Sequence, residues 1–266
     1  MLNNRREALK VIFDDYFKNE KQLTVAEDDI KRIVKEYAYR DMTPRTIKGL
    51  TSEKINDALE NLAQKVFKYI SSSETYSKER FDEWHETTCE EFVEDCQNAL
   101  DFDIGKKITA GKAQKILNMT MKYVFCCLEE EQDVDKFKWC HMTLDHFTLE
   151  NWFSNDVLDW YNEPKDKMDK VAKGRIDNWS ALEYGDSDEI GSYCWIQVRI
   201  REYLSSTIKH KYEGLTPFQA EFYVWQDEKT REALLQVLKL EMSKNKRVPI
   251  HEMCEKVIEL CNRLKV

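Results

Sequence analysis

Apolar residues recur with the spacing of an α-helix along almost the whole chain, and this pattern constrains the fold more than any other feature. Clear examples lie at 55–70 and 81–100, where the apolar positions fall on one helical face. The 266 residues include only seven Gly and four Pro, fewer than the turns of a doubly wound sheet or a β-sandwich normally require. We therefore predict an all-α protein.

Local sequence signals predict the position of individual helices. The segment 116–128 is apolar on almost every side, which is typical of a central helix that its neighbours bury. Thr216-Pro217-Phe218-Gln219 predicts a helix start, with Thr as N-cap and Gln closing a capping box. Further helices are expected after Thr51 and near 8–17, 190–208, 228–243 and 249–264, and a loop is expected at 164–188, where 165–173 can add a short helix.

The domain organisation follows from what the sequence lacks. It contains no repeat of fixed period and no recognisable flexible linker. We expect one compact multi-helix unit over 1–266, and within it we allow two helical lobes, 1–104 and 105–266, with a cleft between them.

Composition and charge limit the partners. The net charge of −9 argues against a broad surface that coats nucleic acid, but it allows a local basic track. Lys106, Lys107, Lys112 and Lys115 form one such group, and 165–175 holds another. No run of about 20 apolar residues spans a bilayer, and the N-terminus reads as an amphipathic helix instead of a signal peptide. We expect a cytoplasmic protein with no membrane partner.

The eight cysteines mostly occupy apolar helical positions, and none forms a C-x-x-C pair. Reduced thiols in the core of a cytoplasmic protein explain this pattern. A metal site built from Cys140 and His141 with Cys126 or Cys127 lacks a second ligand pair. We expect no metal and no other cofactor.

The segment 104–152 contains the candidate catalytic residues. Thr109 can N-cap a helix, which places Lys112 in its opening turn and Lys115 one turn further on. Thr143 can cap the next helix, with Asp145 in its opening turn. These residues also fit two ordinary helix starts without any further role.

A lysine and an aspartate at such positions have useful properties. The positive field of a helix start disfavours an ammonium group, so a buried Lys112 would titrate lower than usual and could attack a sugar carbon as a neutral amine. Lys115 competes for this role. The same field favours an ionised Asp145, which can stabilise cationic character on a sugar.

GKAQKILNMTMKY (111–123) followed by HMTLDHF (141–147) resembles the helix-hairpin-helix DNA glycosylases, above all their archaeal 8-oxoguanine branch. Members of that family are all-α, with a lysine at the start of the hairpin's second helix and an aspartate at the next helix mouth. Lys112 and Asp145 match this order, and Leu144 supplies the apolar residue before the aspartate. The resemblance covers about fifty residues. The L-P-G-V-G type turn of the family is replaced by Ile108-Thr109-Ala110-Gly111.

The resemblance implies base excision from duplex DNA. Asp145 would assist departure of the base, and Lys112 or Lys115 would attack C1′. Phosphates would contact Lys106, Lys107 and Gly111, and the flipped base would need flat apolar surfaces. We name His141, Phe147 and Trp152 as candidates for the base pocket. The base itself stays open between 8-oxoguanine, a modified pyrimidine and a hypermodified phage base.

A second hypothesis needs no catalysis. The chain would then be a helical interaction protein, from a phage, a mobile element or a defence locus. Its acidic surface would bind a basic protein or mimic nucleic acid, and the lysines and the aspartate would serve only as helix starts.

Overall fold

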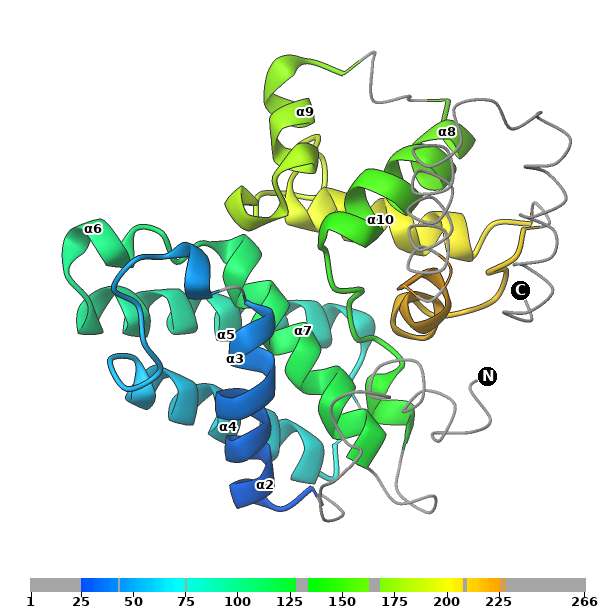
Figure 1. Ribbon diagram of the computed structural model, residues 1–266. Helices are drawn as coiled ribbons and strands as arrows, with labels where there is room; N and C mark the ends of the chain where they lie inside the picture. Colours follow the sequence, from blue (N-terminus) through cyan, green and yellow to red (C-terminus); the bar gives the residue numbers. More distant parts are fainter. Residues whose placement is uncertain are drawn as a thin grey trace, which may run out of the picture.

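The computed structural model describes residues 25–42, 44–74, 76–127, 134–162, 168–207, 210–225 and 227. Every regular element in these residues is a helix (Figure 1), which confirms the all-α prediction. The helices expected at 8–17, 228–243 and 249–264 lie outside the described residues.

The first group of helices surrounds a long central one. The chain runs through α2, η1 and α3 without a break, and η2 and a loop then lead to α4. The bounds are α2 (Glu27–Arg32), η1 (Ile33–Ala38), α3 (Tyr39–Asp41), η2 (Pro44–Thr46), α4 (Asn56–Ser71), α5 (Lys78–Ala99), α6 (Phe102–Gly105) and α7 (Ala110–Cys127). The helix expected from Thr51 begins at Asn56, because 52–55 forms turns.

The second group follows α7 and packs beside it (Figure 1). Its elements are η3 (Val134–Phe137), η4 (Phe147–Val157), α8 (Leu158–Trp160), α9 (Lys170–Asp177), η6 (Trp179–Ala181), α10 (Tyr193–Leu204) and a helix at 217–225. Part of the loop expected at 164–188 is therefore helical. Its helix begins at Lys170 because the Asp169 carboxylate caps it, accepting from the N–H groups of Val171 and Ala172.

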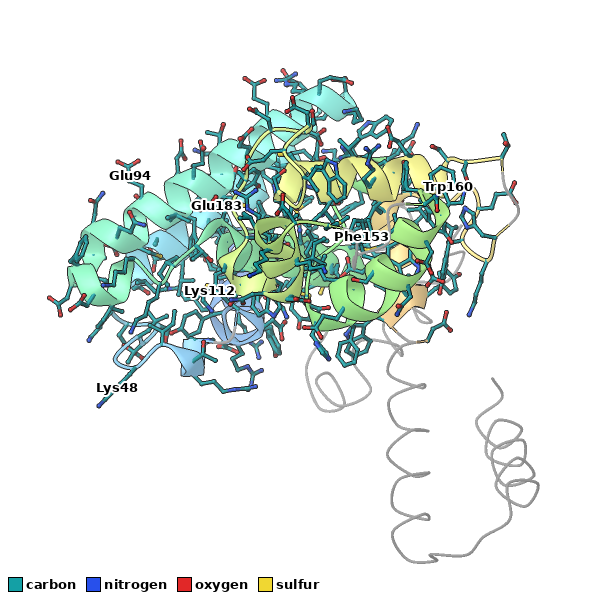
Figure 2. All side chains as sticks on the ribbon, turned by 90° about the horizontal axis from the view of Figure 1, so that it is seen from above. Lys48, Glu94, Lys112, Phe153, Trp160 and Glu183 are labelled. Carbon is teal, nitrogen blue, oxygen red and sulfur yellow. The ribbon has the colours of Figure 1, made fainter. Side chains whose placement is uncertain are left out.

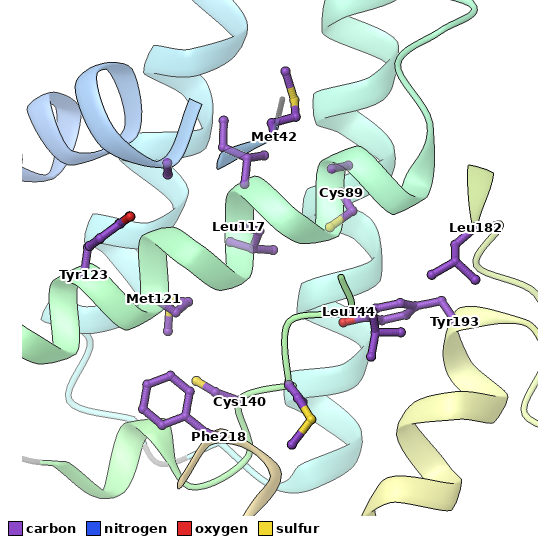
Figure 3. Packing of buried hydrophobic residues seen from close by; sticks show 14 of the residues in the cluster. Met42, Cys89, Leu117, Met121, Tyr123, Cys140, Leu144, Leu182, Tyr193 and Phe218 are labelled. Carbon is purple, nitrogen blue, oxygen red and sulfur yellow. The ribbon is translucent and has the colours of Figure 1, made fainter. Parts of the chain in front are cut away.

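The central helix α7 touches both groups. It packs against η1, α3, α4 and α5 on one side and against η6 on another, and its buried residues cover almost every face, as predicted for 116–128. Figure 3 shows Leu117 and Met121 of α7 among Met42, Cys89 and Phe218 from the helices around it. Because α7 is enclosed, its polar side chains need partners inside the protein.

The predicted capping box at Thr216 is confirmed. The Gln219 N–H donates to the Thr216 hydroxyl at 3.3 Å, and the Thr216 N–H donates to the Gln219 side chain at 3.2 Å. Each bond satisfies a backbone group that a helix start leaves open.

No helix in the described part of the chain is long and apolar enough to cross a membrane.

Candidate functional site

The start of α7 is fixed by its neighbours. The Thr109 hydroxyl accepts from the Lys112 N–H at 3.3 Å and donates to the Ser180 carbonyl at 2.5 Å, so Thr109 is the N-cap that the sequence predicts. This cap places Lys112 in the first turn and Lys115 in the second.

Gly111 has a packing role in place of the phosphate contact expected for it. Its N–H donates to the Leu182 carbonyl at 3.0 Å, so this donor is already used. A Cβ on Gly111 would lie 2.0 Å from the Trp179 carbonyl oxygen, which no side chain tolerates. The glycine therefore lets the segment 179–182 approach the helix start.

Two lysine amines lie over one indole ring. The Nζ atoms of Lys112 and Lys115 are 5.4 and 4.4 Å from the ring centroid of Trp179, within the range of cation–π attraction. Trp179 is not among the site residues that the sequence predicts. Periodicity carries no signal for this contact, because η6 and α7 are far apart along the chain.

Lys115 and Asp145 form the ion pair of the site. Lys115 Nζ lies 3.4 Å from Asp145 Oδ2, and the two side chains are only 12% and 14% exposed. The structure thus brings Asp145 to Lys115, and Trp179 joins Lys112 to the same cluster. We call Lys112, Lys115, Asp145 and Trp179 the lysine–aspartate cluster.

Lys112 differs from Lys115 in its surroundings. Its side chain is 5% exposed and forms no ion pair with a carboxylate in the described ranges. Burial lowers the pKa of the Lys112 amine below its usual 10.5, and the nearby positive charge of Lys115 lowers it further. Lys112 is therefore the amine of the cluster that loses its proton more readily than an ordinary lysine.

Asp145 is itself the cap of the helix that follows it, and Thr143 is not. The Asp145 carboxylate accepts from the Thr148 N–H at 3.1 Å, while the Thr148 hydroxyl accepts from the Asp145 N–H at 2.8 Å. The Thr143 N–H instead donates to the buried Glu221 carboxylate at 2.9 Å. The Thr143 hydroxyl donates to the sulfur of Met119 at 3.9 Å and does not cap the helix, so the cap is Asp145.

Buried glutamines hold the extended segment that delivers Asp145. The Gln114 amide bonds both the N–H and the C=O of Leu144, at 3.2 and 2.9 Å. Gln197 does the same for Met142, at 3.3 and 2.7 Å. Both side chains are buried, and they replace the neighbouring strand that an extended segment would otherwise need.

His141 belongs to a buried polar network and not to an open base pocket. Its Nδ1 lies 2.8 Å from the Tyr193 hydroxyl, and its Nε2 lies 2.8 Å from Asp82 Oδ1. Burial lowers the pKa of His141 to about 4, so at neutral pH its Nε2–H donates to Asp82 and its Nδ1 accepts from Tyr193. Both nitrogens are occupied.

The charged end of this network is Asp82. Its two oxygens accept from Arg201 at 2.6 and 2.8 Å. Burial acts to raise the pKa of Asp82, but the hydrogen bonds from His141 and Arg201 outweigh it and hold the pKa well below its usual range.

The other two base-pocket candidates differ from each other. Trp152 is 1% exposed and packs edge-on against Tyr203 and Tyr212, so it is a core residue and its ring is closed to a base. Phe147 is only partly buried and lies against Trp225, with 6.2 Å between ring centroids.

Lys106 and Lys107 lie exposed in the turn between α6 and α7, and Lys106 pairs with Asp103 at 2.7 Å.

The surface has a hollow of about 310 Å³ between α4 and α5 and another of about 440 Å³ beside α10. Neither hollow is lined by residues of the lysine–aspartate cluster. No three His, Cys, Asp or Glu side chains gather to hold a metal ion within the described residues.

No protein-family model matches the chain, and no curated protein or solved structure is significantly similar to it.

Proposed function

We propose that the protein is a DNA glycosylase that excises a damaged or modified base at the lysine–aspartate cluster. The observation that supports this proposal best is the difference between two neighbouring amines. Lys115 is paired with Asp145 at 3.4 Å, whereas Lys112 is buried beside it with a lowered pKa. A nucleophilic amine must be neutral, and a neighbouring cation and burial are the two effects that make it so.

Each residue then has a separate role. The Lys112 amine forms a bond to C1′ while the bond from C1′ to the base breaks, and the base leaves with the electron pair. Asp145 stabilises the positive charge that develops on the sugar. Lys115 is a positioning residue that holds the Asp145 carboxylate. Opening of the sugar ring gives a Schiff base, which water hydrolyses.

The test uses duplexes that each carry one lesion, including 8-oxoguanine and a modified pyrimidine, together with hypermodified phage DNA. Base release is followed by gel, and borohydride is added to trap a Schiff base. We expect a trapped adduct with the wild type, none with Lys112→Gln, and a trapped adduct at a reduced rate with Lys115→Gln. Asp145→Asn should lower release by a factor on the order of 10²–10³.

Two results would overturn parts of the proposal. Full excision by Asp145→Asn would remove the role of the carboxylate. An adduct with Lys112→Gln but not with Lys115→Gln would move the nucleophile to Lys115. If the wild type releases no base from any substrate, the catalytic proposal is wrong.

The second candidate is a helical interaction protein. The exposed face of α5 supports it, because Glu83, Glu90, Glu91 and Glu94 all lie at the surface there. A basic protein partner would bind this face through charge. Base release by the wild type, together with its loss in Asp145→Asn, would decide against this candidate.

A further inference from the structure

A loop before α4 lies next to the turn that precedes α7. The loop at 44–54 is held by the buried side chains of Ile47 and Leu50. A Cβ built on Gly49 would lie 3.1 Å from Ile104 Cδ1 of α6, so the loop and α6 are in contact. The lysines of the turn at 106–107 therefore have neighbours from a distant part of the sequence.

The two segments together carry a local excess of positive charge. Five cations are exposed on them, and we call these five residues the basic surface: Arg45, Lys48, Lys54, Lys106 and Lys107. Glu53 and Asp103 are the carboxylates of 44–54 and 102–107. The chain as a whole has a net charge of −9, so the basic surface is positively charged within an acidic protein.

Three of these cations form no ion pair within the residues that the structure describes. Lys106 pairs with Asp103 at 2.7 Å, and Lys54 donates to the Gly49 carbonyl at 2.8 Å. Arg45, Lys48 and Lys107 form no ion pair with any carboxylate in the part of the chain that the structure describes. Figure 2 shows the Lys48 side chain projecting outward from its loop. Such groups are free to bind an anionic partner.

The exposed glutamates of α5 lie on another side of the molecule. Glu94 of α5 and Lys48 point to different sides of the molecule in Figure 2, and Glu90 and Glu91 are also exposed on α5. A polyanion is repelled by α5 and attracted by the basic surface, so the charge distribution orients it. The basic surface ends five residues before Lys112, at the start of the helix that carries the lysine–aspartate cluster.

An aromatic ring stands at the edge of the basic surface. Phe102 is 81% exposed, and Lys106 Nζ lies 5.3 Å from its ring centroid. Exposure of such a large apolar ring to water is unfavourable, and solvated surface charges do not require it. Some proteins that bind duplex DNA insert an apolar side chain such as Phe between base pairs while neighbouring cations contact the phosphates.

We propose that the basic surface binds consecutive phosphates of duplex DNA and that Phe102 inserts into a base step at its edge and stacks there. This proposal rests on the proposed function, since it names the surface that would deliver DNA to the lysine–aspartate cluster. Arg45, Lys48 and Lys107, which form no ion pair in the described residues, supply the phosphate contacts.

The test is the salt dependence of binding to a fluorescein-labelled duplex, measured by anisotropy with the full chain. Each phosphate contact contributes about 0.9 to the slope of log K against log salt. The variant Arg45→Gln/Lys48→Gln/Lys107→Gln should therefore reduce the slope by about 2.7. The control variant Lys68→Gln/Lys138→Gln/Lys170→Gln removes three exposed lysines elsewhere and should leave the slope within experimental error of the wild type.

Phe102 is tested separately. Phe102→Ala should weaken duplex binding on the order of tenfold at every salt concentration, with an unchanged slope, because stacking releases no counterions. Equal slopes for the triple variant and its control would overturn the phosphate contacts, and wild-type affinity of Phe102→Ala would overturn the stacking.

Failure here is distinguishable from failure of the proposed function. If the wild type excises a base but the triple variant keeps the wild-type slope, the catalytic proposal stands and DNA does not bind at the basic surface. If no base is excised but the slope falls as expected, DNA binds at the basic surface and the catalytic proposal is wrong.

Discussion

The side-chain amide of Gln114 bonds both backbone groups of Leu144, the residue directly before Asp145. Gln114 also directly precedes Lys115 in α7. One buried amide therefore sets the distance between the two partners of the ion pair, because it ties their backbones together. The cluster depends on this bond pair as much as on the charges themselves.

Gln114→Leu should destabilise the fold and displace Asp145. The variant leaves the N–H and the C=O of Leu144 buried without partners, and we expect a loss of about 2–4 kcal/mol in the free energy of unfolding. Urea unfolding followed by circular dichroism measures it. The exposed Gln64 of α4 offers a control: Gln64→Leu should change the unfolding free energy by less than about 0.5 kcal/mol. Equal stability of the two variants would contradict the role of Gln114.

Lys112 should lower stability at neutral pH and cease to do so in alkali. Its pKa in the folded state lies below the usual 10.5, so the unfolded chain binds more protons, and the contribution of Lys112 to stability rises with pH between the two pKa values. Lys112→Met should therefore be more stable than the wild type at pH 7, with a difference that shrinks toward pH 10.5. Urea unfolding across this range measures the effect.

Lys115→Met is the matched comparison for that experiment. Removing Lys115 leaves the carboxylate of Asp145, which is 14% exposed, without its cation. We expect a loss of about 1–3 kcal/mol at pH 7, opposite in sign to the effect of Lys112→Met. A gain in both variants would show that the two amines occupy equivalent environments.

Much of the fold was predictable because its signals are local. Helical periodicity gives the all-α class and the buried helix α7, and the caps at Thr109 and Thr216 follow from the residue types at helix starts. The site was predictable only as far as Lys112, Lys115 and Asp145. Trp179 and Gln197 reach the site through long-range contacts that leave no periodic trace. Thr143 and Asp145 are equally good cap residues by type, and the long-range contact of the Thr143 hydroxyl with Met119 distinguishes them.

His141 should make stability fall with acid. Its pKa in the fold is about 4, below the usual 6.5, so the unfolded chain takes up the proton first and stability is lost as pH falls from 6.5 toward 4. We expect this single residue to account for on the order of 2–3 kcal/mol over that interval. His141→Gln should show a flatter pH dependence in urea unfolding between pH 7 and 4. A profile parallel to the wild type would mean that His141 titrates normally.

Lys122 and Glu221 form the most deeply buried ion pair that the structure describes, with 2.7 Å between Nζ and Oε1 and side chains 4% and 2% exposed. Lys122→Met leaves the Glu221 charge buried alone and should cost about 3–5 kcal/mol. Burial already raises the pKa of Glu221, so part of this loss should be recovered at lower pH, where the carboxyl group is neutral. Urea unfolding at pH 5 and pH 7 measures both effects.

The double variant Lys122→Met/Glu221→Gln separates charge from hydrogen bonding. Its side-chain amide oxygen still accepts from the Thr143 N–H, which Glu221 binds at 2.9 Å, but no charge is buried. We expect it to recover most of the stability that Lys122→Met loses, because replacing both partners removes the unpaired charge. Double and single variants of equal stability would instead assign the loss to packing around the Lys122 side chain. Since Thr143 lies two residues before Asp145, the double variant should also retain the geometry of the lysine–aspartate cluster.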